Sequence, residues 1–93
     1  MAKILMKDGT EAEVRLTFKD LYDLEKKNPE LAQEYFDAQK KEELNEIDML
    51  KVLRVGYINA GNKEISFEEF LEEVSQNRNN TLSAYYEMLY PKN

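Results

Sequence analysis

The stretch from residue 47 to residue 58 most constrains how this chain can fold, because its apolar side chains occupy most of the circumference of a helix. Asn45 with Asp48 provides a capping signal before it, and Ala60-Gly61-Asn62 provides a stop signal after it. A helix that is apolar on nearly all sides must be covered by its neighbours. We therefore expect it at the centre of the fold. Its apolar members are Ile47, Met49, Leu50, Val52, Leu53, Val55, Tyr57 and Ile58.

An alternating pattern over residues 1–16 predicts a β-hairpin with Asp8-Gly9 as its turn signal. A tight two-residue turn would mix apolar and acidic side chains on one face. We therefore prefer a three-residue loop, residues 7–9, with Gly9 at positive φ and a bulge after it. This register pairs Met6 with Thr10, Ile4 with Ala12 and Lys3 with Glu13, the last as a cross-strand ion pair.

Two helices are predicted between the hairpin and the central helix. Thr17 and Asp20 resemble a capping box, and the helix after them ends near Asn28-Pro29. Asn28 can cap the second helix, because Pro29 is tolerated at a first helical position. The apolar signal then stops at residues 39–43, where the helix either ends or runs on. The expected inward side chains are Phe18, Leu21, Tyr22 and Leu24 in the first helix, and Leu31, Tyr35 and Phe36 in the second.

Two more helices are predicted after the central one. Ser66 and Glu69 form the best capping box in the chain, opening a helix with its glutamates outward. Residues 76–80 are expected to be a polar loop, and Thr81 is expected to cap a last helix that Pro91 halts. The inward side chains of the first of these helices are Phe67, Phe70, Leu71 and Val74, and the last helix carries Leu82, Tyr85, Tyr86 and Leu89 at helical spacing.

These patterns together predict an α+β fold in one domain spanning residues 1–93. The β-hairpin (1–16) packs on a bundle of four to five helices (17–90), followed by a short tail (91–93). The start of the chain has too short an apolar run for a signal peptide, and no segment approaches the length of a membrane span. We expect a soluble, cytoplasmic protein.

Composition excludes most site chemistry. The chain has no histidine and no cysteine, so the usual ligands of zinc and copper and the commonest nucleophiles and bases are absent. Residues 65–70 resemble the end of an EF-hand loop, but counting back puts Ile58, Ala60 and Lys63 at positions that need ligands or glycine. No pair of carboxylates is marked for catalysis. We expect no enzyme, no metal and no cofactor.

Charge and aromatic residues indicate a binding protein instead. Thirteen basic and 19 acidic side chains give a net charge of −6, which disfavours nucleic acid as a partner. The last helix is crowded with side chains that are common in protein interfaces, and it can hide only one face. The alternative is that they close the core. With the exposed side of the hairpin, the candidate partner-binding residues are Tyr85, Tyr86, Met88, Leu89 and Tyr90.

The order of these elements resembles the tail assembly chaperones of long-tailed bacteriophages and prophages. The resemblance covers nearly the whole chain, and it rests on the N-terminal strand pair, the Leu16–Glu25 segment, a polar stretch, the central helix with Ile47, Leu50, Leu53, Tyr57 and Ala60, and the helix start at Ser66-Phe67-Glu68-Glu69.

This resemblance implies a non-enzymatic protein of the host cytoplasm. Such a chaperone coats the long helical tape measure protein, keeps it soluble, helps to recruit tail tube protein and leaves before the virion is finished. It also implies a longer form made by ribosomal frameshifting, for which codons of Tyr90 to Asn93 can supply a slippery site. Self-association is left open. The alternative function is a small acidic adaptor or inhibitor that, like a DNA mimic, occupies a basic groove on a partner protein.

Overall fold

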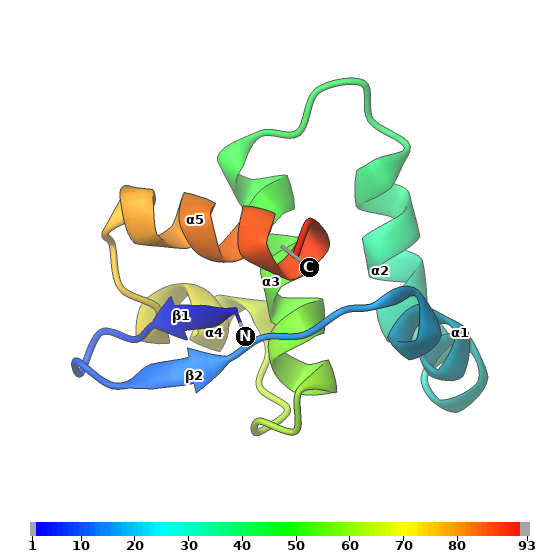
Figure 1. Cartoon of the computed structure of the whole chain (residues 1–93), viewed down its shortest axis with the longest axis horizontal. Helices are drawn as coiled ribbons and strands as arrows, with labels where there is room; N and C mark the ends of the chain where they lie inside the picture. Colours follow the sequence, from blue (N-terminus) through cyan, green and yellow to red (C-terminus); the bar gives the residue numbers. More distant parts are fainter. Residues whose placement is uncertain (1, 92–93) are drawn as a thin grey trace.

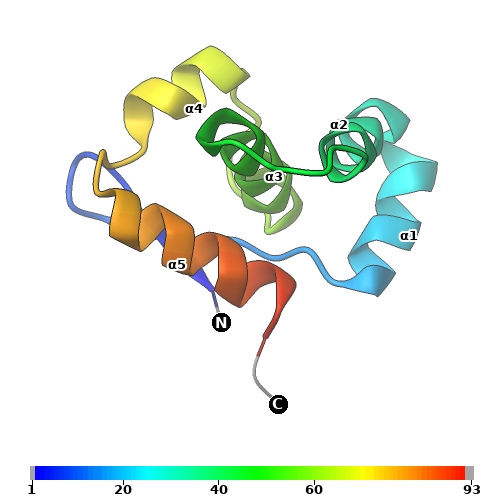
Figure 2. The ribbon, with the colours of Figure 1, turned by 90° about the horizontal axis from the view of Figure 1, so that it is seen from above.

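The α3 helix, Glu46–Asn59, lies at the centre of the molecule (Figures 1 and 2). The computed structural model describes residues 2–91, with extents of 33 × 30 × 28 Å. Val52, Leu53 and Val55 have no exposed surface. The helices α2 (Pro29–Gln39), α4 (Phe67–Glu73) and α5 (Arg78–Leu89) each contact α3, as the continuous apolar surface of this segment predicts. The expected α+β fold, mostly helical with an N-terminal hairpin, is confirmed.

The hairpin has the predicted register. Strands β1, Lys3–Leu5, and β2, Glu11–Glu13, are antiparallel with Ile4 opposite Ala12. Gly9 has a φ of 92°, a conformation that costs glycine little. The expected ion pair between Lys3 and Glu13 is wrong: within residues 2–91, no contact at ion-pair distance joins them. The two residues are opposite each other, but an exposed pair gains little energy and loses side-chain entropy.

A third segment, not predicted, lines the other edge of β1. The Lys7 N–H donates to the Glu73 carbonyl at 2.7 Å, and the Ser75 N–H donates to the Leu5 carbonyl at 3.0 Å. The Asn80 side chain accepts a hydrogen bond from the Leu5 N–H at 2.9 Å. The hairpin is therefore tied to the segment just before α5, Arg78–Leu89, and to the first turn of that helix, and β2 is the outer strand.

The helix starts are set by side-chain caps. Helix α1, Phe18–Lys27, and α3 both begin with the predicted capping boxes, and Asn28 caps α2, Pro29–Gln39. Helix α4, Phe67–Glu73, has only one of the two hydrogen bonds of its expected capping box. There the Ser66 hydroxyl accepts from the Glu69 N–H at 3.1 Å, but the reciprocal bond is absent. Each cap satisfies N–H groups that have no partner within the helix.

The polar stretch after α2 is a break. Helix α2 ends at Gln39, and residues 40–45 connect it to α3 without helical structure. This answers the question that the sequence left open. The two helices then pack together, and the Arg54 guanidinium of α3 forms an ion pair with Glu34 of α2 at 3.1 Å. The same guanidinium donates a hydrogen bond to the Ile65 carbonyl, before α4, at 2.8 Å.

The last helix begins earlier than predicted. Helix α5, Arg78–Leu89, starts where a polar loop was expected. The cap is Asn77, whose side chain accepts from the Asn80 N–H at 3.2 Å, and not Thr81. The Thr81 hydroxyl instead donates to the Asn77 carbonyl inside the first turn, at 3.2 Å. Of the predicted tail, Pro91 is exposed, while Lys92 and Asn93 lie outside the described residues.

Helix α1 buries a narrower face than predicted. Leu21 and Leu24 are buried, but Phe18 is 91% exposed and Tyr22 is 56% exposed, so the expectation that these two aromatic side chains face inward is wrong. Helix α1 packs on α2 at the edge of the molecule (Figure 2), and one neighbour covers only one stripe. Phe18 and Tyr22 lie one turn apart on a different side of the helix from that stripe.

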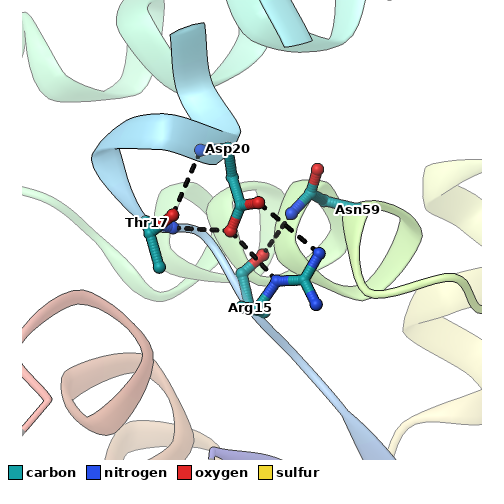
Figure 3. Close-up of polar contacts among 4 residues, drawn as sticks. All are labelled: Arg15, Thr17, Asp20 and Asn59. Atoms are coloured by element: carbon teal, nitrogen blue, oxygen red, sulfur yellow. Dashed lines mark hydrogen bonds and ion pairs between the residues drawn. The ribbon is translucent and has the colours of Figure 1, made fainter. Parts of the chain in front are cut away.

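A polar cluster fixes the entry into α1 (Figure 3). The Asp20 carboxylate accepts from the Thr17 N–H at 2.9 Å and pairs with the Arg15 guanidinium at 3.1 Å. The Asn59 side chain at the end of α3 donates to the Arg15 carbonyl at 2.9 Å. These hydrogen bonds outweigh the effect of burial on Asp20 and lower the pKa of its carboxyl. The link between hairpin and helices is thereby tied to α3.

Candidate functional site

An open apolar groove lies where the start of α3, the end of α4 and the start of α5 meet. Its volume is about 520 Å³. Ile47 is 47% exposed and Leu82 is 42% exposed, so large apolar side chains reach the solvent there. We call this surface the apolar groove. Its apolar lining residues are Leu44, Ile47, Met49, Leu50, Leu71, Val74 and Leu82.

The groove arises because α3 is apolar on more sides than its neighbours cover. Figure 1 shows the first turn of α3 extending above α5, and α4 packs on α3 farther along that helix, where the Phe70 and Tyr57 rings lie 5.4 Å apart. Helix α4 has only seven residues, and the chain then runs along β1 instead of along α3. Met49 and Leu50 are therefore only half-buried. Uncovered apolar surface on a small protein is typical of an interaction site.

The rim of the groove is polar. Glu46 and Arg78 form an ion pair across it at 2.6 Å, with both side chains largely exposed. Ser75, Gln76, Asn79 and Thr81 complete the rim. An apolar floor inside a polar rim is the arrangement found in protein interfaces.

Exposed aromatic side chains extend the groove along α5. Leu82, Tyr86 and Tyr90 lie at four-residue intervals and are 42%, 53% and 69% exposed. The rings of Tyr86 and Tyr90 are 6.1 Å apart. Residues four apart share one face of a helix. Leu82, Tyr86 and Tyr90 therefore form a continuous strip, the α5 stripe, that starts in the groove.

The five candidate partner-binding residues differ in how much of each side chain is exposed. Tyr86 and Tyr90 are exposed and Leu89 is half-buried, but Tyr85 and Met88 are 4% and 5% exposed. These two side chains belong to the core and are not exposed for direct contact with a partner.

The packing of α5 on α3 explains the burial of Met88. The Met88 sulfur lies against Gly56, where α5 crosses α3 and where a side chain on residue 56 would collide with it. Burial also raises the pKa of the Tyr85 hydroxyl. The exposed side of the hairpin, the other suggested surface, carries Lys3 and Glu11 with only Leu5 as an apolar member.

Sequence reasoning missed most of the groove. It placed Ile47 and Leu82 among the buried apolar residues and did not single out Leu44. The available signal was the excess of apolar side chains around α3. That signal shows that α3 must be covered by other elements on most sides. It does not show which part of the helix those elements leave exposed.

Among the described residues, the buried carboxylate has an ion-pair partner. Asp48 is buried, but its carboxylate pairs with Lys41 at 2.8 Å, and that hydrogen bond lowers the pKa of the carboxyl. Within residues 2–91, no group of three or more acidic side chains is placed to hold a metal ion. The rejected EF-hand alignment puts its first position, Ile58, inside α3.

Comparison with known proteins adds no name to this geometry. Over residues 2–91, the structure contains no helix with the length and apolar character that a bilayer span requires. No protein-family model, no curated protein and no solved structure matches the chain.

Proposed function

We propose that this protein is a non-enzymatic tail assembly chaperone of a long-tailed bacteriophage or prophage, and that its apolar groove binds the tape measure protein. The observation that carries the proposal is the open groove of about 520 Å³, which continues into the α5 stripe. The resemblance in the order of elements supplies the biological context. In this role the protein acts in the host cytoplasm, assists assembly of the tail tube protein and is absent from the finished virion.

The groove suits an amphipathic helix. Such a helix offers apolar side chains at positions i, i+3, i+4 and i+7, and these are recognised by apolar grooves with polar rims. A long helical protein that awaits assembly exposes many such segments. Leu82 and Ile47 provide contacts from opposite sides of the groove, and Tyr86 extends the contact along α5.

The net charge supports the same role. Nineteen acidic against 13 basic side chains give −6, and the glutamates of α4 are exposed on the side away from its buried Phe70. A strongly charged exterior keeps proteins apart in solution. A chaperone that covers an apolar partner with its groove would present this exterior to the solvent.

Substitutions in the groove test the proposal. We expect Ile47→Ser combined with Leu82→Ser to weaken capture of an amphipathic tape measure fragment at least about tenfold, a loss of about 1.4 kcal/mol of binding free energy. The fragment is immobilised, and capture is measured by surface plasmon resonance. Circular dichroism confirms that the variant is folded. Phe18→Ser is the control, because it removes an exposed apolar side chain that does not line the groove.

Full-strength capture by the folded Ile47→Ser, Leu82→Ser variant would overturn the proposal. A Tyr86→Ala, Tyr90→Ala variant then measures the part played by the α5 stripe, where we expect a smaller loss because both rings lie beyond the groove itself.

The second candidate, an acidic adaptor or inhibitor of a basic protein, is favoured by one observation. A hollow at the hairpin is lined by five carboxylates. Salt distinguishes the two functions, because the Debye length falls from about 30 Å at 0.01 M to about 3 Å at 1 M. Apolar capture of the tape measure fragment should persist at high salt. Capture that disappears steeply with salt would instead favour the adaptor.

A further inference from the structure

The outer face of α1 carries aromatic side chains that nothing in the described chain covers. Phe18 is 91% exposed, and Tyr22 follows one turn later at 56%. The Lys26 ammonium lies 4.1 Å from the centre of the Tyr22 ring, and that of Lys19 lies 5.5 Å from it. We call Phe18, Lys19, Tyr22 and Lys26 the basic aromatic face. An almost fully exposed phenylalanine is costly to hydrate, so a partner that covers it gains free energy.

The opposite end of the molecule carries a hollow of complementary character. It is about 630 Å³ in volume and lies between the hairpin, Tyr57 and the end of α4. Met6, Ala12 and Tyr57 supply its apolar surface. We call it the acidic hollow, because its lining includes the five carboxylates of Asp8, Glu11, Glu13, Glu72 and Glu73, with Lys7 as the only basic side chain among the lining residues.

The carboxylates of the acidic hollow are available to a cationic partner. None of the five belongs to an ion pair within residues 2–91. Asp8 accepts two hydrogen bonds from Thr10, which lower the pKa of its carboxyl, so it is ionised at neutral pH. Burial raises the pKa of the Tyr57 hydroxyl, and the charge of Glu73 adds to that shift.

We propose that copies of this protein associate head to tail, with the basic aromatic face of one copy seated in the acidic hollow of the next. Charge complementarity selects a second copy as the occupant: the hollow is acidic, and the α1 face presents two lysines beside its exposed rings. The rings of Phe18 and Tyr22 would contact the apolar surface of the hollow, and Lys26 would meet its carboxylates. Lys19 pairs with Asp23 at 2.8 Å and would exchange that exposed ion pair for a carboxylate of the hollow.

The geometry makes this contact one between copies. Figure 1 shows the hairpin and α1 at opposite ends of the molecule, so a chain cannot fill its own hollow. A contact between two different surfaces is heterologous, and it propagates into a filament unless its rotation closes a ring. The apolar groove shares no lining residue with the acidic hollow. If the proposed function holds, a row of copies therefore offers a row of open grooves to one long partner.

Sedimentation velocity over a concentration series, from about 1 μM to about 1 mM, tests the association. We expect the sedimentation coefficient of the natural protein to rise with concentration and to rise less at high salt. Phe18→Ser and the pair Lys19→Glu, Lys26→Glu should remain monomers at concentrations where the natural protein assembles. A natural protein that stays monomeric over the whole series overturns the proposal.

A charge swap separates the proposed contact from a general effect of charge or folding. Glu72→Lys with Glu73→Lys reverses the hollow and should also give a monomer. Mixing this variant with Lys19→Glu, Lys26→Glu should restore assembly, because each reversed surface then meets an opposite charge. Glu42→Lys with Glu43→Lys, in the exposed connection between α2 and α3, changes the net charge equally and should not alter assembly. Failure of the mixture to assemble contradicts the contact.

Different variants test the binding of the tape measure protein in the groove and the head-to-tail association, so that failure of one proposal can be distinguished from failure of the other. The Ile47→Ser, Leu82→Ser variant should lose capture of the tape measure fragment but still assemble. Phe18→Ser should lose assembly but still capture the tape measure fragment. Capture is measured on dilute protein, so that assembly does not contribute to it. If both variants lose both properties, the head-to-tail contact between these surfaces is wrong.

Discussion

Asp48 is the one charged side chain in the core of the described residues, with 2% of its surface exposed. Its N–H donates to the Asn45 side chain at 2.9 Å, and its carboxylate accepts from the Lys41 ammonium at 2.8 Å. A buried carboxylate without partners would be strongly destabilising. Asp48, the third helical residue in the capping box of α3, therefore also ties the connection after α2 to the first turn of α3.

The Asp48 contact predicts a pH dependence of stability. The hydrogen bond from Lys41 lowers the pKa of this carboxyl, burial opposes the shift, and the Asn45 N–H adds to it. A pKa lowered on folding stabilises the protein above the unfolded value, about 3.9, and that contribution is lost as the pH falls through the folded value. In urea unfolding between about pH 5 and pH 2, Asp48→Asn should therefore lose less stability than the natural protein.

Asp37→Asn is the control for this measurement, because the Asp37 carboxylate is exposed and lies 3.9 Å from Lys40. Its pH dependence should match that of the natural protein. An Asp48→Asn variant with an unchanged pH profile would contradict the role given to the Lys41 contact.

At the scale of the element, the start of α5 depends on both local and distant contacts. Asn77 caps the helix, but Asn79 and Asn80 in its first turn are weak helix formers. The Asn80 side chain also accepts from the Leu5 N–H in β1. This contact is separated by 75 residues in sequence, and it holds the first turn of α5 in place. Sequence propensity alone therefore puts the helix start too late.

The position of this cap can be measured. Asn77→Ala should lower the free energy of unfolding by about 1 kcal/mol, because it leaves the Asn80 N–H without its partner. Thr81→Ala should cost less, since Thr81 lies inside the helix and alanine favours helices. Urea denaturation of both variants gives the comparison. A larger loss for Thr81→Ala would place the cap where the sequence pattern predicted it.

At the scale of the whole molecule, the hairpin is held by contacts at both of its edges. Residues 73–75 pair with β1, while the side chains of Asn59 and Asn62 donate to the carbonyls of Arg15 and Glu13. The Arg15 N–H also donates to the Gly56 carbonyl at 3.1 Å. The hairpin therefore depends on the helices for its position, as a two-stranded sheet does when it is not stable alone.

Removing the two asparagine side chains should loosen the hairpin as a unit. Asn59→Ala with Asn62→Ala should lower the free energy of unfolding by about 1–3 kcal/mol, because carbonyl partners are left unpaired. Hydrogen exchange at the Arg15 amide should become faster, while the amide of Leu53, in the buried middle of α3, keeps the highest protection. Equal acceleration at both amides would show that the hairpin and α3 open together.

Local features of the fold were predictable because short-range chemistry determines them. Gly9 and the alternation around it determine the turn and the register of the hairpin, and Thr17, Asn28 and Asn45 begin their helices through bonds to N–H groups three residues away. The candidate site was only partly predictable. Tyr86 and Tyr90 are exposed, as expected for a helix with too many apolar side chains for one buried face. Ile47 is exposed because the neighbouring elements leave the start of α3 uncovered, which its own segment does not show.

The sequence by itself determined where the turn, the caps and the apolar periods lie, since each depends on residues close together in the chain. Only the tertiary structure decided which apolar faces are covered. Met88 is buried because α5 crosses α3 at Gly56, and Phe18 is exposed because α1 has a neighbour on one side only. Burial depends on how many elements surround a given face, and that number follows from the packing of the whole chain.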